Sequence, residues 1–166
     1  MPSSAPPRRI AVYDRRKDLV VLAYHMNDAG FRLPGLPAIQ VDVGATSTEL
    51  SRIIREVLAA SRSDVPTPKR AEYPRYFKPV LQAVGAKAWS DVERNARRVD
   101  IVQTESGELR IIPTRNGGAR GPDQGFHELP SLEFTIPADA FDEVLSAAVR
   151  RGLELSETKS RKSRRS

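Results

Sequence analysis

Cysteine is absent from the 166 residues, and so is any long apolar run. Without cysteine the chain cannot form disulfides, thiolate zinc sites or a cysteine nucleophile. No run approaches the roughly 20 apolar residues that a membrane-spanning helix needs. The first residues, MPSSAPPRR, lack the apolar core of a secretory signal. We therefore expect a soluble, cytoplasmic protein that does not enter a membrane.

Residue patterns that carry catalysis are also scarce. No nucleophile elbow and no metal-ligand spacing surrounds either histidine, His25 or His127. Nucleases often hold a divalent metal with Asp and Glu-x-Lys on neighbouring strands, but here Asp100 is followed by Glu-Leu-Arg at 108–110. These gaps predict no catalytic residues, no metal site and no cofactor. We expect a protein that is not an enzyme.

Residues 115–125 form a glycine-rich segment with four glycines and no large apolar residue. Backbone amides in such a segment can cradle phosphate. The spacing, however, fits neither a Walker loop nor a dinucleotide fingerprint. We interpret the segment as a flexible connector, with contact to a partner protein as the alternative.

Positive charge is concentrated in the two tails. The chain has 27 Lys and Arg against 21 Asp and Glu. Seven of the basic residues lie outside the central region, namely Arg8, Arg9, Lys159, Arg161, Lys162, Arg164 and Arg165. Residues 10–156 carry 20 charges of each sign and are neutral overall. We expect a disordered arm at 1–8, one domain at 9–156 and a disordered basic tail at 157–166.

The basic tail has two interpretations. It can attract nucleic acid weakly, through charge and without sequence preference. It can also simply keep the protein soluble. Nucleic acid is otherwise not an expected partner of the domain.

Alternating apolar and polar residues predict strands. A hairpin from about Arg97 to Thr114 turns at Ser106-Gly107, with one face in the core and the other, which carries Arg98 and Asp100, in solvent. Further strands are expected at 9–14, 18–25 and 38–43, and residues 27–37 are expected to form a loop because they hold two glycines and two prolines.

Two segments of the chain each predict a strand followed by a helix. In both helices the apolar residues recur with the helical period, as in a helix with one buried face. The first helix carries Leu50, Ile53, Ile54, Val57 and Leu58, has a capping box at Thr46 and Glu49, and ends after Ser61. The second unit has a strand at 132–136, followed by a helix with Asp139 as its expected N-cap and Gly152 near its end. The expected buried face of this helix consists of Phe141, Val144, Leu145, Ala148 and Val149. The two units align, which predicts a pseudo-duplicated domain, although coincidence explains the alignment equally well.

Together these patterns predict the α+β type of α/β fold, an antiparallel sheet with packed helices. Between the two units, a short helix is expected at 73–85 and another turn or two at 89–96. Their aromatic residues are expected to form a lid on the core.

The middle and end of the chain resemble a known family. The segments are YPRYFKPVL from residue 73, VGAKAW from 84, IIPTR from 111, GFHELP from 125 and FTIPA from 134. They are similar to segments of immunity proteins from bacterial contact-dependent growth inhibition (CDI) systems, over residues 40–156. The resemblance implies a non-catalytic cytoplasmic protein that binds the C-terminal toxin domain of a CDI exoprotein (CdiA), often a nuclease. It also implies a fold like that of the Whirly proteins, which bind single-stranded DNA, and in part of the family a toxin hairpin that adds to the sheet.

Six residues match the family-like segments and are expected to face the partner. They are Arg75, Tyr76, Lys78, Lys87, Arg115 and Phe126. The alternative is that the aromatic residues are core and the basic residues are simply solvated. A rival function is a Whirly-like module that binds single-stranded nucleic acid through basic residues.

Overall fold

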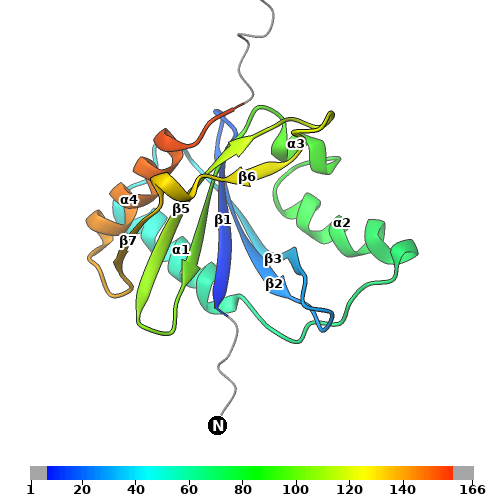
Figure 1. The fold of residues 1–166 in the computed structure, drawn as a ribbon, viewed down its shortest axis with the longest axis horizontal. Helices are drawn as coiled ribbons and strands as arrows, with labels where there is room; N and C mark the ends of the chain where they lie inside the picture. The colour runs from blue at the N-terminus through cyan, green and yellow to red at the C-terminus, as the bar shows by residue number, and fades with distance from the viewer. Residues whose placement is uncertain (1–6, 159–166) are drawn as a thin grey trace, which may run out of the picture.

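A seven-stranded antiparallel sheet is the centre of residues 7–158, the part of the chain that the computed structural model describes (Figure 1). The strands are β1 (Arg8–Asp14), β2 (Leu19–Met26), β3 (Arg32–Val41), β4 (Arg97–Gln103), β5 (Glu108–Asn116), β6 (Phe126–Glu128) and β7 (Phe134–Pro137). Their order is β3-β2-β1-β4-β5-β6, and β7 also pairs with β5. Since β4 occupies one edge of β5, β6 and β7 share the other edge.

One face of the sheet packs against α1 (Ser47–Ala60) and α4 (Asp142–Leu155), which lie side by side (Figure 1). Alternate residues of each strand point to this face because the side-chain period of a strand is two. Its fully buried members include Ile10, Val12, Val21, Leu50, Ile54, Val99, Ile101, Ile111, Leu145 and Val149. This layer is the main hydrophobic core.

The opposite face is covered over β1–β3 by α2 (Tyr73–Ala83) and α3 (Trp89–Glu93). Short 3₁₀ turns precede α2 (η1, Arg70–Glu72) and β7 (η2, Pro130–Leu132). The second core joins Ala11, Tyr13, Val20, Leu22, Val80, Val84, Val92 and Ala96. Among residues 7–158, no helix combines the length and the apolar character needed to cross a bilayer.

The expected α+β class is confirmed, as are the hairpin, the first two strands and the first helix. The hairpin is β4–β5, and Gly107 has the positive φ, +82°, that its tight turn requires. Thr46 caps α1 by accepting a hydrogen bond from the backbone N–H of Glu49 at 3.2 Å. Ser61 ends α1, as expected.

The expected loop at 27–37 is wrong in its second half, since β3 begins at Arg32 and contains Pro34 and Pro37. Proline cannot donate a backbone hydrogen bond, so it is tolerated only where a strand has a free side. β3 provides that side because it is the edge strand beside β2.

The start of the last helix also differs from the prediction. α4 begins at Asp142 with Phe141 as its N-cap, not Asp139. Phe141 is 80% exposed and Val144 is 45% exposed, so neither belongs to the buried face. Gly152 lies inside the helix, where a Cβ would come within 2.7 Å of Val99 and 2.9 Å of Ile111. Helix and sheet approach too closely at this point for a larger residue.

The two strand-then-helix units take corresponding places, since β3 and β7 flank the sheet and their helices α1 and α4 pack together. The likeness to Whirly proteins stays a prediction. Arg8 is part of β1, and Glu157 forms a bridge beside Arg115, so both continue the folded domain. The rest of the expected arm and tail, residues 1–6 and 159–166, lies outside the described residues.

Candidate functional site

An open groove runs between α2 and α3, on the side of the sheet away from α1 and α4. It has a volume of about 600 Å³ and is lined by Tyr73, Pro74, Phe77, Lys78, Leu81, Gln82, Ala86, Lys87 and Trp89. The spacing of Tyr73, Phe77 and Leu81 is four residues, which places them on one face of α2. We call this hollow the aromatic groove.

Stacked aromatic rings form the floor of the aromatic groove. The Phe77 ring lies 5.9 Å from Tyr73, stacked at 9°, and 5.8 Å from Trp89. Only Val80 of α2 is fully buried. The expected lid is therefore half exposed, and an apolar patch rimmed by polar residues is a common feature of protein-binding surfaces.

The segment 69–97, which includes α2 and α3, is the basic part of the folded region. It holds seven basic residues, Lys69, Arg70, Arg75, Lys78, Lys87, Arg94 and Arg97, and three acidic ones, Glu72, Asp91 and Glu93. Since residues 10–156 are neutral overall, the rest of that region carries the opposite net charge. Charge is thus separated along the folded chain.

A second hollow of about 380 Å³ lies beyond Trp89. It is lined by Trp89, Ser90, Glu93, Arg94, Asn95, Asn116, Gly118, Ala119, Gln124 and Gly125. We call it the Glu93 cavity. Trp89 lines both the aromatic groove and the Glu93 cavity, so the two hollows are neighbours.

The glycine-rich segment forms a wall of the Glu93 cavity. Its two arms are joined by hydrogen bonds from Gly117 N–H to Gly125 O (2.8 Å) and from Gly125 N–H to Gly118 O (2.9 Å). A Cβ on Gly117 would collide with the carbonyl oxygen of Asp123, at 1.4 Å. The segment is therefore a closed loop with a defined shape.

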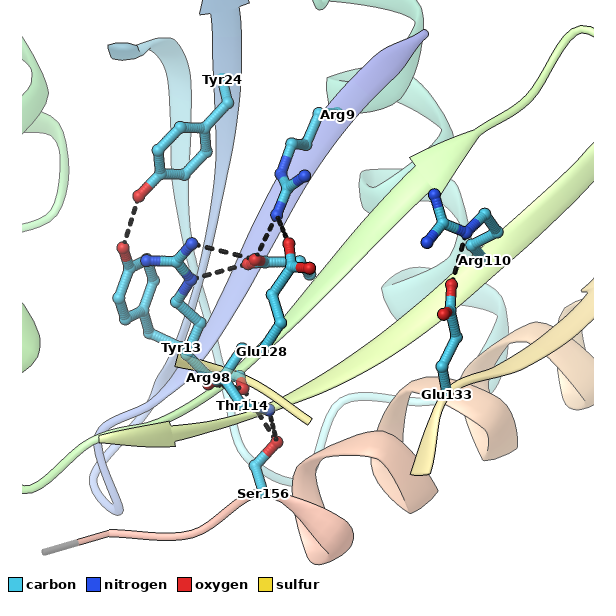
Figure 2. Close-up of polar contacts among 10 residues, drawn as sticks. Arg9, Tyr13, Tyr24, Arg98, Arg110, Thr114, Glu128, Glu133 and Ser156 are labelled. Carbon is cyan, nitrogen blue, oxygen red and sulfur yellow. Dashed lines mark hydrogen bonds and ion pairs between the residues drawn. The ribbon is translucent and has the colours of Figure 1, made fainter. Parts of the chain in front are cut away.

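Arg98 and Asp100, both in β4, form a buried ion pair on the same side of the sheet, and Figure 2 shows Arg98 beside Tyr13. The Arg98 guanidinium donates hydrogen bonds to both carboxylate oxygens of Asp100, at 2.6 and 2.9 Å. Its central carbon lies 5.0 to 5.7 Å from the ring centroids of Tyr13, Tyr24 and Phe126. The expectation that Arg98 and Asp100 face solvent is wrong: the three rings surround Arg98, and Asp100, which Arg98 and Arg9 contact, is 1% exposed.

The two tyrosines beside Arg98 form a neutral hydrogen bond. The hydroxyl oxygens of Tyr13 and Tyr24 lie 2.7 Å apart (Figure 2). Burial raises the pKa of both hydroxyls, most strongly that of Tyr13. Both therefore stay protonated at neutral pH, and the positive charge of Arg98 is balanced by Asp100.

Arg9 extends this network to the edge of the sheet. It donates hydrogen bonds to Asp100 and to Glu128, each at 2.6 Å. Arg110 on β5 forms an ion pair with Glu133, next to β7 (Figure 2). These ion pairs hold β6 and β7 against the rest of the sheet and so fix the end of the glycine-rich loop.

The two histidines have backbone partners. His25 Nδ1 accepts a hydrogen bond from the Arg62 N–H at 2.9 Å, and Nε2 lies 2.7 Å from Leu36 O. His127 Nε2 lies 2.9 Å from Asp123 O. Within residues 7–158, no three His, Asp or Glu side chains are grouped so as to hold a metal ion.

The six residues expected to face a partner lie in three places. Lys78 and Lys87 are exposed on the rim of the aromatic groove. Arg75 and Tyr76 line a neighbouring hollow of about 330 Å³. The other two lie on the β5–β6 ribbon.

On that ribbon, Arg115 is exposed and Phe126 packs edge-on against Tyr13. Glu93 lines the Glu93 cavity and is not among the residues expected from the sequence. Its spacing of four from Trp89 places the two residues on one face of α3, but no sequence signal predicts the cavity itself.

Comparison with family models identifies one family. The profile of the CDI immunity protein family matches residues 8–156. Among solved structures, a protein of unknown function, NMB0488 from Neisseria meningitidis, superposes with a TM-score of 0.70 at 16% identity, over 94% of this chain and 99% of that one. A CdiA-CT/CdiI toxin and immunity complex from Yersinia pseudotuberculosis superposes with a TM-score of 0.65 at 15% identity, over 92% and 98%.

No curated protein sequence gives a significant match. The two solved structures, below 25% identity, establish a shared fold. The profile covers most of the chain and confirms the resemblance seen in the sequence segments. The chain belongs to the CDI immunity protein family.

Proposed function

We propose that this protein binds the C-terminal toxin domain of its cognate CDI exoprotein in the cytoplasm. It neutralises the toxin by forming a tight 1:1 complex with it. The observation that carries the proposal is the match of the immunity family over residues 8–156. The structural neighbour from Yersinia pseudotuberculosis, a complex of toxin and immunity protein, supports it. Proteins of this family act as inhibitors and not as enzymes, which supports neutralisation by binding.

The aromatic groove is the proposed docking surface for the toxin. Its aromatic floor offers apolar area with few rotatable bonds, which is typical of the residues that dominate binding energy. Lys78 and Lys87 on its rim, within the basic segment 69–97, favour a toxin surface that is apolar at its centre and acidic around it. Arg75 and Tyr76 extend this surface from the next hollow, and Arg115 and Phe126 supply a separate contact on the β5–β6 ribbon.

Docking into the groove is favoured over strand addition. The edge strand β3 contains Pro34 and Pro37, which cannot donate backbone hydrogen bonds. At the other side of the sheet, β6 has three residues and β7 has four. These edges offer short or interrupted ladders to an incoming strand.

The toxin is proposed to be a nuclease, as toxins partnered by the family that the sequence resembles often are. The experiment is co-expression of the chain with the toxin domain encoded beside it, followed by purification of the complex and assay of nucleic-acid cleavage. A 1:1 complex without cleavage activity is expected. If the toxin remains free and active, the proposed function is wrong.

A paired charge reversal tests the docking surface. Lys78→Glu with Lys87→Glu should weaken toxin binding at least about tenfold, because two favourable contacts become repulsive. Arg52→Glu with Arg151→Glu is the matched control, since these arginines are exposed on the α1–α4 side. Titration calorimetry measures both. Equal affinities of the two variants would remove the aromatic groove as the docking surface.

A single-stranded nucleic-acid module is the second candidate, because lysines beside stacked aromatic rings also suit base stacking. Full-length protein and a variant with glutamine for the five basic residues of 159–166 should be titrated with single-stranded DNA. Salt-sensitive binding that persists without the tail charges and is lost in the Lys78/Lys87 reversal would favour this candidate.

A further inference from the structure

The Glu93 cavity holds a carboxylate that no described residue pairs with. Within residues 7–158, the Glu93 side chain makes no hydrogen bond and no ion pair, although its backbone oxygen accepts hydrogen bonds from Ala96 and Asn116. Burial raises the pKa of Glu93, and the nearby positive charge of Arg98 opposes that rise only in part. Glu93 is of intermediate exposure, so water still reaches its carboxylate, but the carboxylate is partly desolvated and a positively charged group would stabilise its charged form.

The amide side chain in the cavity is already occupied. Asn116 donates from Nδ2 to the backbone oxygens of Glu93 and Ala96, both at 2.9 Å, and its Oδ1 accepts from Gly118 N–H at 2.9 Å. These bonds tie α3 to β5 and to the glycine-rich loop. The walls are therefore preformed, and the Glu93 carboxylate remains available as an acceptor.

A cation entering the cavity would also meet the Trp89 ring. Trp89 and Glu93 are four residues apart in α3 and both line the cavity. A lysine or arginine beside an indole gains cation–π attraction in addition to an ion pair. A volume of about 380 Å³ is many times the roughly 30 Å³ that one water occupies, which leaves room for more than water.

The described cations near the cavity are engaged elsewhere or exposed. Arg98 is bound to Asp100. Arg94 is exposed and makes no ion pair with Glu93. The chain's own basic tail is a competitor, since Glu157 O accepts a hydrogen bond from Asn116 N–H at 2.8 Å and residues 159–166 follow directly.

We infer that the Glu93 cavity receives one lysine or arginine side chain of the toxin domain when that domain docks in the aromatic groove. The inference rests on the proposed function and extends it, because Trp89 joins the two hollows and a single partner covers both. The toxin would then present a lysine or arginine to the Glu93 cavity, next to the apolar and acidic surface that contacts the aromatic groove. A toxin that lacks this combination would bind less well, so the combination also selects one toxin over others.

The substitution Glu93→Gln tests this inference, because it removes the charge and keeps the shape. Toxin affinity should fall at least about tenfold. The melting temperature of the free protein should stay the same or rise, since an unpaired, partly buried charge is lost. Glu49→Gln on exposed α1 is the matched control and should leave the affinity unchanged.

A double-mutant cycle identifies the partner group. Each exposed lysine and arginine of the toxin is changed to methionine and titrated against both the wild-type immunity protein and its Glu93→Gln variant. One toxin position should lose affinity for the wild-type protein and show little further loss with the variant. If the wild-type protein binds the toxin but Glu93→Gln binds equally well, the inference is wrong while the proposed function stands. If the wild-type protein does not bind, the proposed function itself fails.

A second set of variants shows whether the cation in the cavity comes from the toxin or from the chain's own tail. The five basic residues of 159–166 are replaced by glutamine, and Glu93→Gln is compared in that protein. The affinity loss should persist without the tail charges. A loss that disappears in this background would assign the cavity to the tail and overturn the inference.

Discussion

Arg98 shows how one residue can have a role opposite to the one its sequence position suggests. It alternates with apolar residues in β4, a pattern that places it in solvent. In the structure, three aromatic rings surround it and Asp100 neutralises it. The pattern identifies which face a residue is on, but what covers that face comes from residues far away in the sequence.

Arg98→Ala should lower the free energy of unfolding by about 3 kcal/mol, because it leaves Asp100 buried with Arg9 as its remaining partner and empties the space between the rings. Arg97→Ala changes the exposed neighbour and should cost less than about 0.5 kcal/mol. Urea unfolding monitored by circular dichroism measures both. Similar values for the two variants would contradict a buried role for Arg98.

The burial and hydrogen bonding of His25 predict that the protein loses stability in mild acid. Nδ1 must be unprotonated to accept the Arg62 N–H, and burial lowers the pKa of His25 below its usual value. When the pH falls below about 6.5, the unfolded chain binds a proton that the folded protein excludes. The free energy of unfolding should therefore decrease from pH 7.5 to 5.5, by at most about 1.4 kcal/mol per pH unit.

The variant His25→Gln should flatten this pH dependence, whereas His127→Gln should retain it, since His127 is exposed. Urea unfolding at both pH values distinguishes the two. An unchanged slope in His25→Gln would assign the pH dependence to another group.

At the scale of elements, the close contact between α4 and the sheet depends on Gly152. Alanine favours helix over glycine by about 1 kcal/mol, which alone predicts a stabilising change. The added Cβ would lie within 3 Å of Val99 and Ile111, and overpacking of this kind costs about 1–3 kcal/mol. Gly152→Ala should therefore destabilise the protein by about 1 kcal/mol in thermal or urea unfolding. A more stable variant would show that helix and sheet can separate without cost.

The elements that the sequence predicts well are those whose signals are local. α1 follows from its buried stripe and Thr46, and the hairpin from alternation and Gly107. The start of β3 is missed because prolines usually mark loops, and only the tertiary pairing shows that β3 is an edge. Phe141 fits the helical spacing but precedes the first turn of α4.

In the candidate site, too, features with a local sequence signal are predictable and features that depend on tertiary contacts are not. Lys78 and Lys87 are predictable as exposed basic residues of a family-like segment, and both rim the aromatic groove. The Glu93 cavity is not predictable, because it forms only when residues 117–125 fold back over α3. A wall contributed by a segment that distant in the sequence leaves no periodic signal.

At the scale of the whole molecule, the neutral region of residues 10–156 has its charges separated between two sides. The segment 69–97 is basic, whereas an acidic end gathers Glu105, Glu108, Asp139, Asp142 and Glu143 around the β4–β5 turn and the start of α4. Figure 1 shows α2 on the right of the sheet and β7 with α4 on the left. A docking partner therefore meets opposite charge on the two sides.

This separation predicts the effect of salt on toxin binding. If the toxin approaches the aromatic groove with an acidic surface, its association rate should fall about tenfold or more between roughly 0.05 and 0.5 M salt, because exposed charges are screened beyond a few ångströms at high salt. Stopped-flow mixing measures the rate. The Lys78/Lys87 charge reversal should reduce this salt dependence, and the Arg52/Arg151 reversal should leave it close to wild type. A faster association in the Lys78/Lys87 variant would instead mean that a basic toxin surface approaches, and docking would then belong to the acidic end, where the exposed ring of Phe141 supplies the apolar contact.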